Sequence, residues 1–174
     1  MLKWIEIDRR VIRANARAIK RELKPGVKFM AVVKADGYGH GAAEVSRAAL
    51  AGGADLLGVL TAEEGARLRA AGLKAPIVCL APSLPDEAGE IAKHRLIPTV
   101  DGLPLARALA RRGSAARPLP CRVDMDLGLR RWGVEPGAFP AFTEKLAALR
   151  SLRPLAVSTH LAYTPRKNLV EAGE

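Results

Sequence analysis

The chain has 174 residues and a formal net charge of +10; 49% of its residues are hydrophobic and 4% are aromatic. This length and composition are typical of one globular domain with a packed core, and no apolar run is long enough to span a membrane. The positive charge raises the alternative of nucleic-acid binding, but the basic residues are dispersed and aromatic stacking platforms are few, so we expect a solvated basic surface with neither a nucleic-acid nor a membrane partner.

The first part of the chain alternates short apolar runs with amphipathic stretches. Residues 4–7 predict a short strand, and Asp8 is placed to cap a helix over residues 9–23. The elements that follow are a strand ending at Lys34, a helix over 42–51, a strand over 56–59, and a helix from Thr61 to Ala71. Glycines or prolines separate these elements, as expected for short connections.

The second part repeats the alternation. Strands are predicted over residues 76–80, 96–100, 121–126 and 155–160, with helices over 86–94, 103–113 and 140–150. Strands that alternate with helices form right-handed units with a parallel sheet. An open doubly wound sheet and a (β/α)₈ barrel both fit the pattern, but the candidate functional residues fall at strand carboxyl ends, as in barrels. We therefore expect an α/β fold, an incomplete TIM-type barrel with about six of eight strands.

Lys34 ends a β-branched run and precedes a glycine-rich turn in the string Ala31-Val32-Val33-Lys34-Ala35-Asp36-Gly37-Tyr38-Gly39-His40-Gly41. At the end of a buried strand it would lose water, which favours the neutral amine that condenses with aldehydes. The glycines permit a close turn, and the next helix offers N–H groups to an anion. An amine beside an anion site is what pyridoxal 5'-phosphate requires. The alternative is a strand-end lysine that only reaches solvent.

The string from Ala31 to Gly41 resembles the cofactor-lysine motif of bacterial alanine racemases, and similarity extends over residues 3–163. The resemblance implies that residues 1–163 are the amino-terminal part of a pyridoxal-phosphate-binding barrel and that residues 164–174 are a polar tail. It also implies interconversion of L-alanine and D-alanine for peptidoglycan synthesis, by a homodimer when the protein is complete. Lys34 would then be the catalytic residue that holds the cofactor, and Tyr38 would contact its phosphate.

A second segment, Asp126-Leu127-Gly128-Leu129-Arg130-Arg131-Trp132-Gly133-Val134, resembles the family pattern Asp-Thr-Gly-Met-x-Arg-x-Gly-Val. This match implies that Arg131 lies near the phenolic oxygen of the cofactor and the substrate carboxylate, with Asp126 in support, and that Arg130 faces elsewhere. Asp124 stands where many family members have a lysine that becomes carbamylated and holds this arginine. Because aspartate is already an anion, we expect Asp124 to hold Arg131 directly.

A third segment, Ser158-Thr159-His160-Leu161-Ala162, resembles the family's Thr-His-Phe-Ala and implies that His160 lies beside the cofactor ring. An ordinary structural histidine is the alternative. In the family, a tyrosine from the partner subunit's carboxy-terminal domain is the second base, and neither Tyr38 nor Tyr163 is marked for that role. We therefore expect this chain alone to be inactive. The alternatives are a non-enzymatic pyridoxal-phosphate-binding barrel protein and an inactive truncated remnant.

Cysteine and histidine placement adds two expectations. Cys79 and Cys121 both lie in apolar runs, which favours reduced core residues over a disulfide. The histidines are far apart in the sequence and lack metal-ligand spacing, so we expect no metal. The opening residues carry no signal-peptide core, which indicates the cytoplasm.

Overall fold

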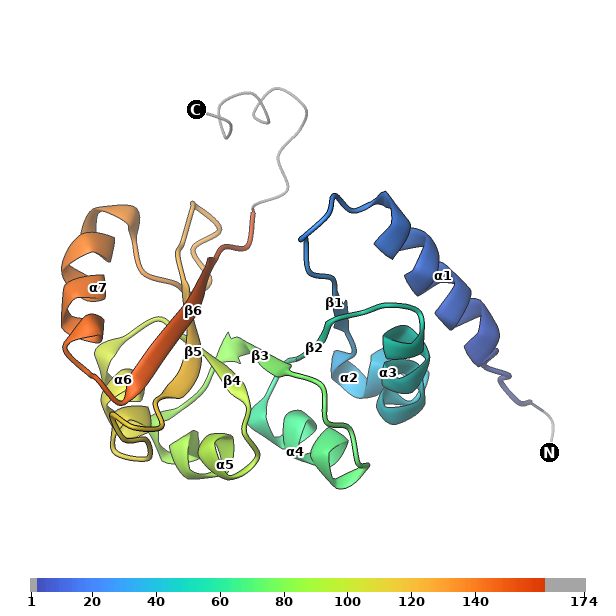
Figure 1. The fold of residues 1–174 in the computed structure, drawn as a ribbon, viewed down its shortest axis with the longest axis horizontal. Helices are drawn as coiled ribbons and strands as arrows, with labels where there is room; N and C mark the ends of the chain where they lie inside the picture. The colour runs from blue at the N-terminus through green and yellow to red at the C-terminus, as the bar shows by residue number, and fades with distance from the viewer. Residues whose placement is uncertain (1–2, 162–174) are drawn as a thin grey trace.

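The computed structural model describes residues 3–161, which form a six-stranded parallel sheet with helices between the strands (Figure 1). The strands are β1 (Met30–Val32), β2 (Leu56–Val59), β3 (Ile77–Pro82), β4 (Ile97–Val100), β5 (Leu119–Asp124) and β6 (Leu152–Ser158). The helices are α1 (Arg9–Glu22), α2 (Lys34–Tyr38), α3 (Ala42–Ala51), α4 (Ala62–Ala70), α5 (Ala88–Lys93), α6 (Leu103–Ala110) and α7 (Phe139–Ala147), with 3₁₀ turns η1 (Pro85–Glu87) and η2 (Pro136–Ala138). The predicted alternation of strands and helices is confirmed.

Strand order decides between the two architectures that the sequence allowed. Each strand pairs in parallel with the next strand along the chain, from β1 to β6. A doubly wound sheet would reverse its order at a switch point, whereas a barrel wall advances in one direction. Within residues 3–161, β1 and β6 are the two edges of the sheet and do not pair with each other. The expected incomplete barrel is therefore confirmed.

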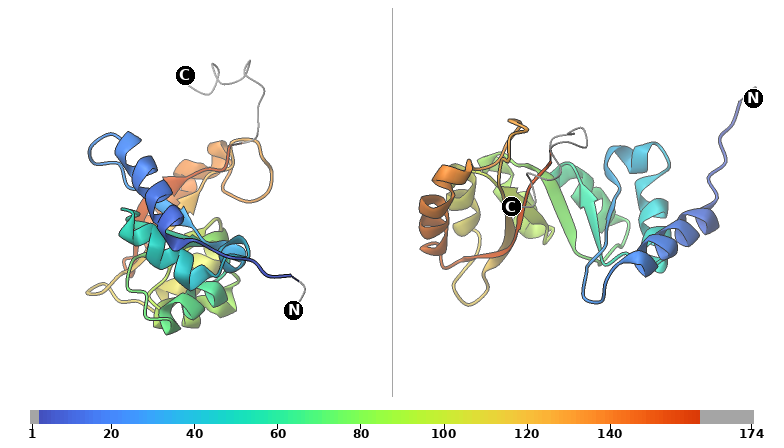
Figure 2. Two further views of the ribbon diagram at one scale, coloured as in Figure 1. Left: turned by 90° about the vertical axis from the view of Figure 1, so that its right-hand side faces the viewer. Right: turned by 90° about the horizontal axis from the view of Figure 1, so that it is seen from above.

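The hydrophobic core lies between the sheet and the helices that cover its outer side (Figure 2). Alternate strand residues point toward the helices because the side-chain period of a strand is two. The sheet contributes Leu57, Val59, Ile77, Cys79, Val100, Cys121 and Val123, and the helices contribute Leu68, Ile91, Leu109 and Leu146. Cys79 and Cys121 are free and buried, as predicted. The other face of the sheet is left for the barrel interior.

Helix α1 begins where the sequence predicts, because the Asp8 carboxylate accepts the backbone N–H of Arg10 at 2.8 Å. The helix packs against α3 through small residues. A Cβ atom at Gly52 would lie 2.5 Å from the Arg13 carbonyl oxygen, so only glycine permits this close approach. Helix α1 thereby covers the β1 side of the sheet.

Three sequence predictions need correction. Residues 4–7 are not a strand: Trp4 and Ile5 are 73% and 86% exposed, and no strand of the described chain lies beside them to accept their hydrogen bonds. The helix predicted over 86–94 is split into η1 and α5. The strand expected to end at Lys34 ends at Val32, because Val33 leaves the extended conformation with a ψ of 21°, ahead of the left-handed turn that begins at Ala35. Ala162, Tyr163 and the predicted polar tail lie outside the described residues.

The open side of the barrel leaves apolar side chains exposed along β6. Leu155 and Val157 are 47% and 57% exposed, and the outer edge of this strand has no partner among residues 3–161. Val157 pairs with Val123, whose side chain packs under the helices, so these exposed side chains lie on the helix side of the sheet. None of the described helices is long and apolar enough to cross a membrane.

Candidate active site at the carboxyl ends of the strands

A pocket of about 310 Å³ opens at the carboxyl ends of the strands. Its apolar lining is Met30, Val32, Leu60 and Leu80, and its polar and aromatic lining is Lys34, Tyr38, Arg122, Asp124, Arg131, Trp132, Thr159 and His160. Carboxyl ends of parallel strands meet at one end of a barrel, which is where barrel enzymes place their chemistry. The fold thus brings together Lys34, Tyr38, Arg131 and His160, which are far apart in the sequence.

The segment after Lys34 is a single left-handed helical turn. Ala35, Asp36, Gly37 and Tyr38 have φ angles of 50°, 52°, 63° and 56°. Each non-glycine residue in this conformation costs roughly 1–2 kcal/mol, so the turn requires support from the rest of the fold. The turn brings Tyr38 back to the pocket that Lys34 lines.

Glu64, at the start of α4, is one of these supports. Its Oε1 accepts the backbone N–H of Ala35 at 2.7 Å, and its Oε2 accepts that of Leu60 at 2.6 Å. One carboxylate therefore joins the residue after Lys34 to the exit of β2. The sequence analysis places Glu64 only within the helix from Thr61 to Ala71, and that placement gave no sign of the contact with Ala35.

The anion site expected at the start of α3 is wrong. The Asp36 carboxylate already accepts the Ala42 N–H at 2.8 Å, and no residue of α3 lines the pocket. The left-handed turn causes this, because it directs Asp36 onto the helix. Tyr38, by contrast, lines the pocket and its side chain is 59% exposed.

The sequence predicts that Lys34 is removed from water at the end of a buried strand. In the structure its side chain is only half-buried. The open wall between β1 and β6 leaves part of the side chain in contact with solvent. His160 lies two residues beyond the end of β6, is exposed, and lines the same pocket.

The loop after β5 carries Arg131 and is shaped by Asp126. Asp126 Oδ1 accepts the backbone N–H groups of Gly128 and Arg130, each at 3.0 Å. Asp126 therefore supports the loop and does not line the pocket. The guanidinium of Arg131 stacks on Trp132, with its Cζ 3.8 Å from the ring centroid. Arg130 is exposed and outside the pocket lining, as expected.

The predicted pairing of Asp124 with Arg131 is wrong in this structure. Asp124 is 3% exposed and its Oδ1 accepts a hydrogen bond from Ser158 Oγ at 2.6 Å, whereas no ion pair joins Asp124 to Arg131 in the described chain. Stacking on Trp132 places the Arg131 guanidinium elsewhere. Arg122, two residues earlier on the same face of β5, lines the pocket together with Asp124, whose charge partly offsets the lowering of the Arg122 pKa by burial.

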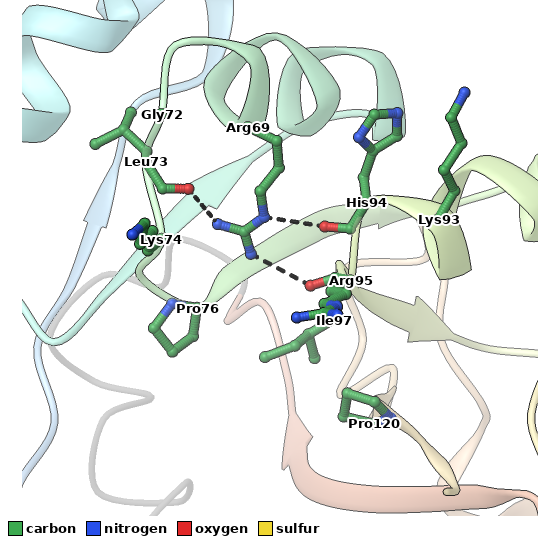
Figure 3. A pocket seen from close by; sticks show the side chains of 10 residues that line it. All are labelled: Arg69, Gly72, Leu73, Lys74, Pro76, Lys93, His94, Arg95, Ile97 and Pro120. Atoms are coloured by element: carbon green, nitrogen blue, oxygen red, sulfur yellow. Dashed lines mark hydrogen bonds between the residues drawn. The ribbon is translucent and has the colours of Figure 1, made fainter.

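A larger cavity, about 630 Å³, lies at the opposite end of the strands (Figure 3). It is lined by Pro76, Ile97 and Pro120, where β3, β4 and β5 begin. Its central polar group, the Arg69 guanidinium, donates to the carbonyl oxygens of Leu73, Ala75, His94 and Arg95. Because these donors are used to join chain segments, the smaller pocket at the carboxyl ends is the better candidate for chemistry.

The geometry defines a class of protein: an α/β barrel, open in the described residues, whose lysine, tyrosine, arginine and histidine meet at the carboxyl ends of its strands. Comparison with known families extends this result. Residues 7–172 match the family described as "Alanine racemase, N-terminal domain". The chain belongs to this family.

Individual relatives agree with the family assignment. The alanine racemase of Symbiobacterium thermophilum is 40% identical over 161 residues, which cover 91% of this chain and 42% of the relative. That of Desulfovibrio desulfuricans is 38% identical over 160 residues, covering 91% and 43%. The chain thus spans less than half the length of these curated relatives.

Solved structures show the same partial correspondence. The crystal structure of alanine racemase from E. faecalis superposes with a TM-score of 0.84 at 28% identity, covering 90% of this chain and 43% of that one. Alanine racemase from Bacillus anthracis, with bound L-Ala-P, gives a TM-score of 0.83 at 31% identity, covering 91% and 42%.

Proposed function

We propose that this chain supplies the amino-terminal, cofactor-lysine part of an alanine racemase that uses pyridoxal 5'-phosphate. The observation that carries the proposal is the pocket that gathers Lys34, Tyr38, Arg131 and His160 at one end of the sheet. The donor set fits this cofactor, because it offers one amine for the aldehyde and several donors for anionic oxygens. The pocket volume, about 310 Å³, lies at the small end of the range for ligand sites.

Each side chain has a role that suits its chemistry. Lys34 would hold the cofactor through its Nζ and move the α-proton on one face of the amino acid. The Tyr38 hydroxyl would donate to the phosphate. The permanently charged Arg131 would face the phenolic oxygen and the substrate carboxylate, and His160 would lie beside the ring. When bound, the cofactor supplies the electron sink for proton removal.

The function of the whole protein follows as part of the same proposal. The protein would interconvert L-alanine and D-alanine for peptidoglycan synthesis in the cytoplasm, as a homodimer. Proton delivery on the second face of the substrate would come from the partner subunit's tyrosine that the family resemblance implies. The relatives, which are more than twice as long as the matched region, support this division of the site.

Covalent trapping tests the proposal. The chain is incubated with pyridoxal 5'-phosphate, reduced with borohydride, digested and mapped by mass spectrometry. We expect the label on Lys34, no label at that position in Lys34→Ala, and unchanged labelling in Lys74→Ala, which alters the opposite end of the barrel. Equal labelling of several surface lysines, or the same total label in Lys34→Ala, would contradict the proposal.

A further inference from the structure

We infer that Arg122 is a ligand-binding residue whose guanidinium holds an anionic oxygen on the side of the pocket opposite Tyr38. The inference rests on the proposed function and adds to it a residue that the sequence motifs do not mark. The oxygen is the phenolic oxygen of the cofactor ring, and not an oxygen of the phosphate.

The position of Arg122 on β5 directs it into the pocket. Its neighbours Cys121 and Val123 are 0% and 2% exposed and pack in the core under the helices. Because successive strand residues point to opposite faces, Arg122 and Asp124 share the inner face, and both line the pocket.

Two neighbouring strands hold the guanidinium in place. Arg122 Nε donates to Thr99 Oγ1 at 2.7 Å, and Nη2 donates to the Leu80 carbonyl oxygen at 3.0 Å. Thr99 Oγ1 in turn donates to the Cys79 carbonyl oxygen at 2.5 Å. A guanidinium has five N–H donors, so these two bonds leave donors for a ligand while removing side-chain freedom. Such preorganisation lowers the entropic cost of binding.

The charge of Arg122 is incompletely balanced by the protein. Burial lowers the pKa of the Arg122 guanidinium, and the Asp124 carboxylate counteracts this only in part. The pocket lining holds Lys34, Arg122 and Arg131 against the single carboxylate of Asp124. An anionic ligand would complete the balance, and in a partly enclosed pocket its attraction to a fixed cation is stronger than in water.

The sheet order indicates which oxygen is involved. Tyr38 follows β1, whereas Arg122 lies on β5 and Arg131 follows that strand, several strands along the wall. If the phosphate binds at Tyr38, Arg122 is too far along the wall to contact it and lies beside the ring of the cofactor. Arg122 and Arg131 form one cationic side of the pocket, and Tyr38 marks the other.

Titration of the full 174-residue chain tests the inference. Binding of pyridoxal 5'-phosphate and of pyridoxal, which lacks the phosphate, is followed by visible absorbance of the protein-bound form. Arg122→Gln retains a hydrogen-bond donor near Thr99 and removes the charge, Arg122→Lys retains the charge, and Arg153→Gln on exposed β6 is the matched control. We expect Arg122→Gln to raise Kd about tenfold or more for both compounds, Arg122→Lys to raise it less, and Arg153→Gln to leave it unchanged.

A second readout needs no substitution. Phenylglyoxal modification of arginines is mapped on the unaltered chain. Bound pyridoxal 5'-phosphate or pyridoxal should suppress the modification of Arg122 and leave that of Arg153 unchanged. Unchanged Kd values in a folded Arg122→Gln, or unchanged Arg122 modification, would overturn the inference alone. A penalty seen only with the phosphorylated compound would overturn the assignment to the ring side. Failure of the unaltered chain to bind either compound at Lys34 would overturn the proposed function and this inference with it.

Discussion

The Glu64 carboxylate accepts the backbone N–H of Ala35, the residue that follows Lys34, at a distance of 2.7 Å. Its second oxygen accepts the N–H of Leu60, so a single side chain from α4 connects the exits of β1 and β2. A hydrogen bond to a charged acceptor is stronger than one between neutral groups. Glu64 is therefore a support of the turn that positions Lys34, although it does not line the pocket.

Replacing Glu64 should weaken both the fold and the lysine site. We expect Glu64→Ala to lower the free energy of unfolding by about 1–3 kcal/mol, because two backbone donors lose their acceptor. Glu63→Ala is the control, since Glu63 is largely exposed and pairs with Arg67 on the helix surface, and it should change stability by less than about 0.5 kcal/mol. Urea unfolding followed by circular dichroism measures both. Equal stability of the two variants would show that the Ala35 contact is unimportant.

The left-handed turn predicts a stabilising substitution. Ala35 has a φ of 50°, which glycine adopts without the Cβ penalty, so Ala35→Gly should raise the free energy of unfolding by about 0.5–1 kcal/mol after the entropy of the unfolded chain is counted. Ala18→Gly, on the exposed side of α1, should instead lower it by about 0.5–1 kcal/mol. Thermal unfolding of the two variants should thus shift in opposite directions, and a destabilised Ala35→Gly would contradict the observed turn.

Gly133 is needed to fold the loop that carries Arg131. Its φ is 111°, and a Cβ atom there would lie 2.7 Å from the Asp126 backbone nitrogen. Gly133→Ala should therefore lower the free energy of unfolding by roughly 1–3 kcal/mol and weaken cofactor binding. Gly137→Ala, whose added Cβ meets nothing within 4 Å, should have little effect. The comparison is made by urea unfolding and by cofactor titration, and similar values for the two variants would argue against strain at Gly133.

The buried thiols predict a loss of stability at high pH. Burial raises the pKa of Cys79 to about 12 and that of Cys121 to about 11, from an ordinary value of 9.0. Below pH 9 both thiols are protonated in the folded and unfolded chain, and their contribution is fully present. Between pH 9 and the raised pKa values only the unfolded chain releases the protons, so the free energy of unfolding falls with rising pH.

The slope of this decline is measurable. Each thiol should contribute a loss on the order of 1.4 kcal/mol per pH unit above pH 9. Urea unfolding at pH 8, 9 and 10 should show a shallower decline for Cys79→Ala than for the unaltered chain. Identical slopes would mean that Cys79 titrates in the folded state as it does in the unfolded one.

Racemase activity should be low in the 174-residue chain alone. The sequence holds two tyrosines, and the proposed role of Tyr38 is to contact the phosphate, whereas Tyr163 carries no mark of a base. General acid–base assistance is worth about 10²–10⁴-fold, so loss of the second base should cost at least that order. Circular dichroism of L-alanine with added cofactor measures turnover, with Lys34→Ala as the blank. Turnover within about tenfold of an intact relative would contradict this expectation.

Local patterns in the sequence determined most of the fold. Apolar period, capping residues and glycine stops are properties of neighbouring residues, so the strands and helices from Asp8 to Ser158 were predicted within a few residues. The grouping of Lys34, Arg131 and His160 also followed, because parallel strands present their carboxyl ends at one edge. The strand predicted over residues 4–7 is absent. A strand needs a neighbouring strand for its hydrogen bonds, and the described residues provide none there.

The tertiary structure alone decided how the site is held. The left-handed turn depends on Glu64, which lies 29 residues beyond Ala35 in the sequence. The partner of Asp124 depends on which side chain meets it from the neighbouring strand, and that side chain is Ser158, while Arg131 stacks on Trp132. Sequence spacing specifies which face of a strand a residue occupies. Whether two side chains from different strands form a hydrogen bond depends on their distance and orientation, which are set only when the sheet has folded and curved.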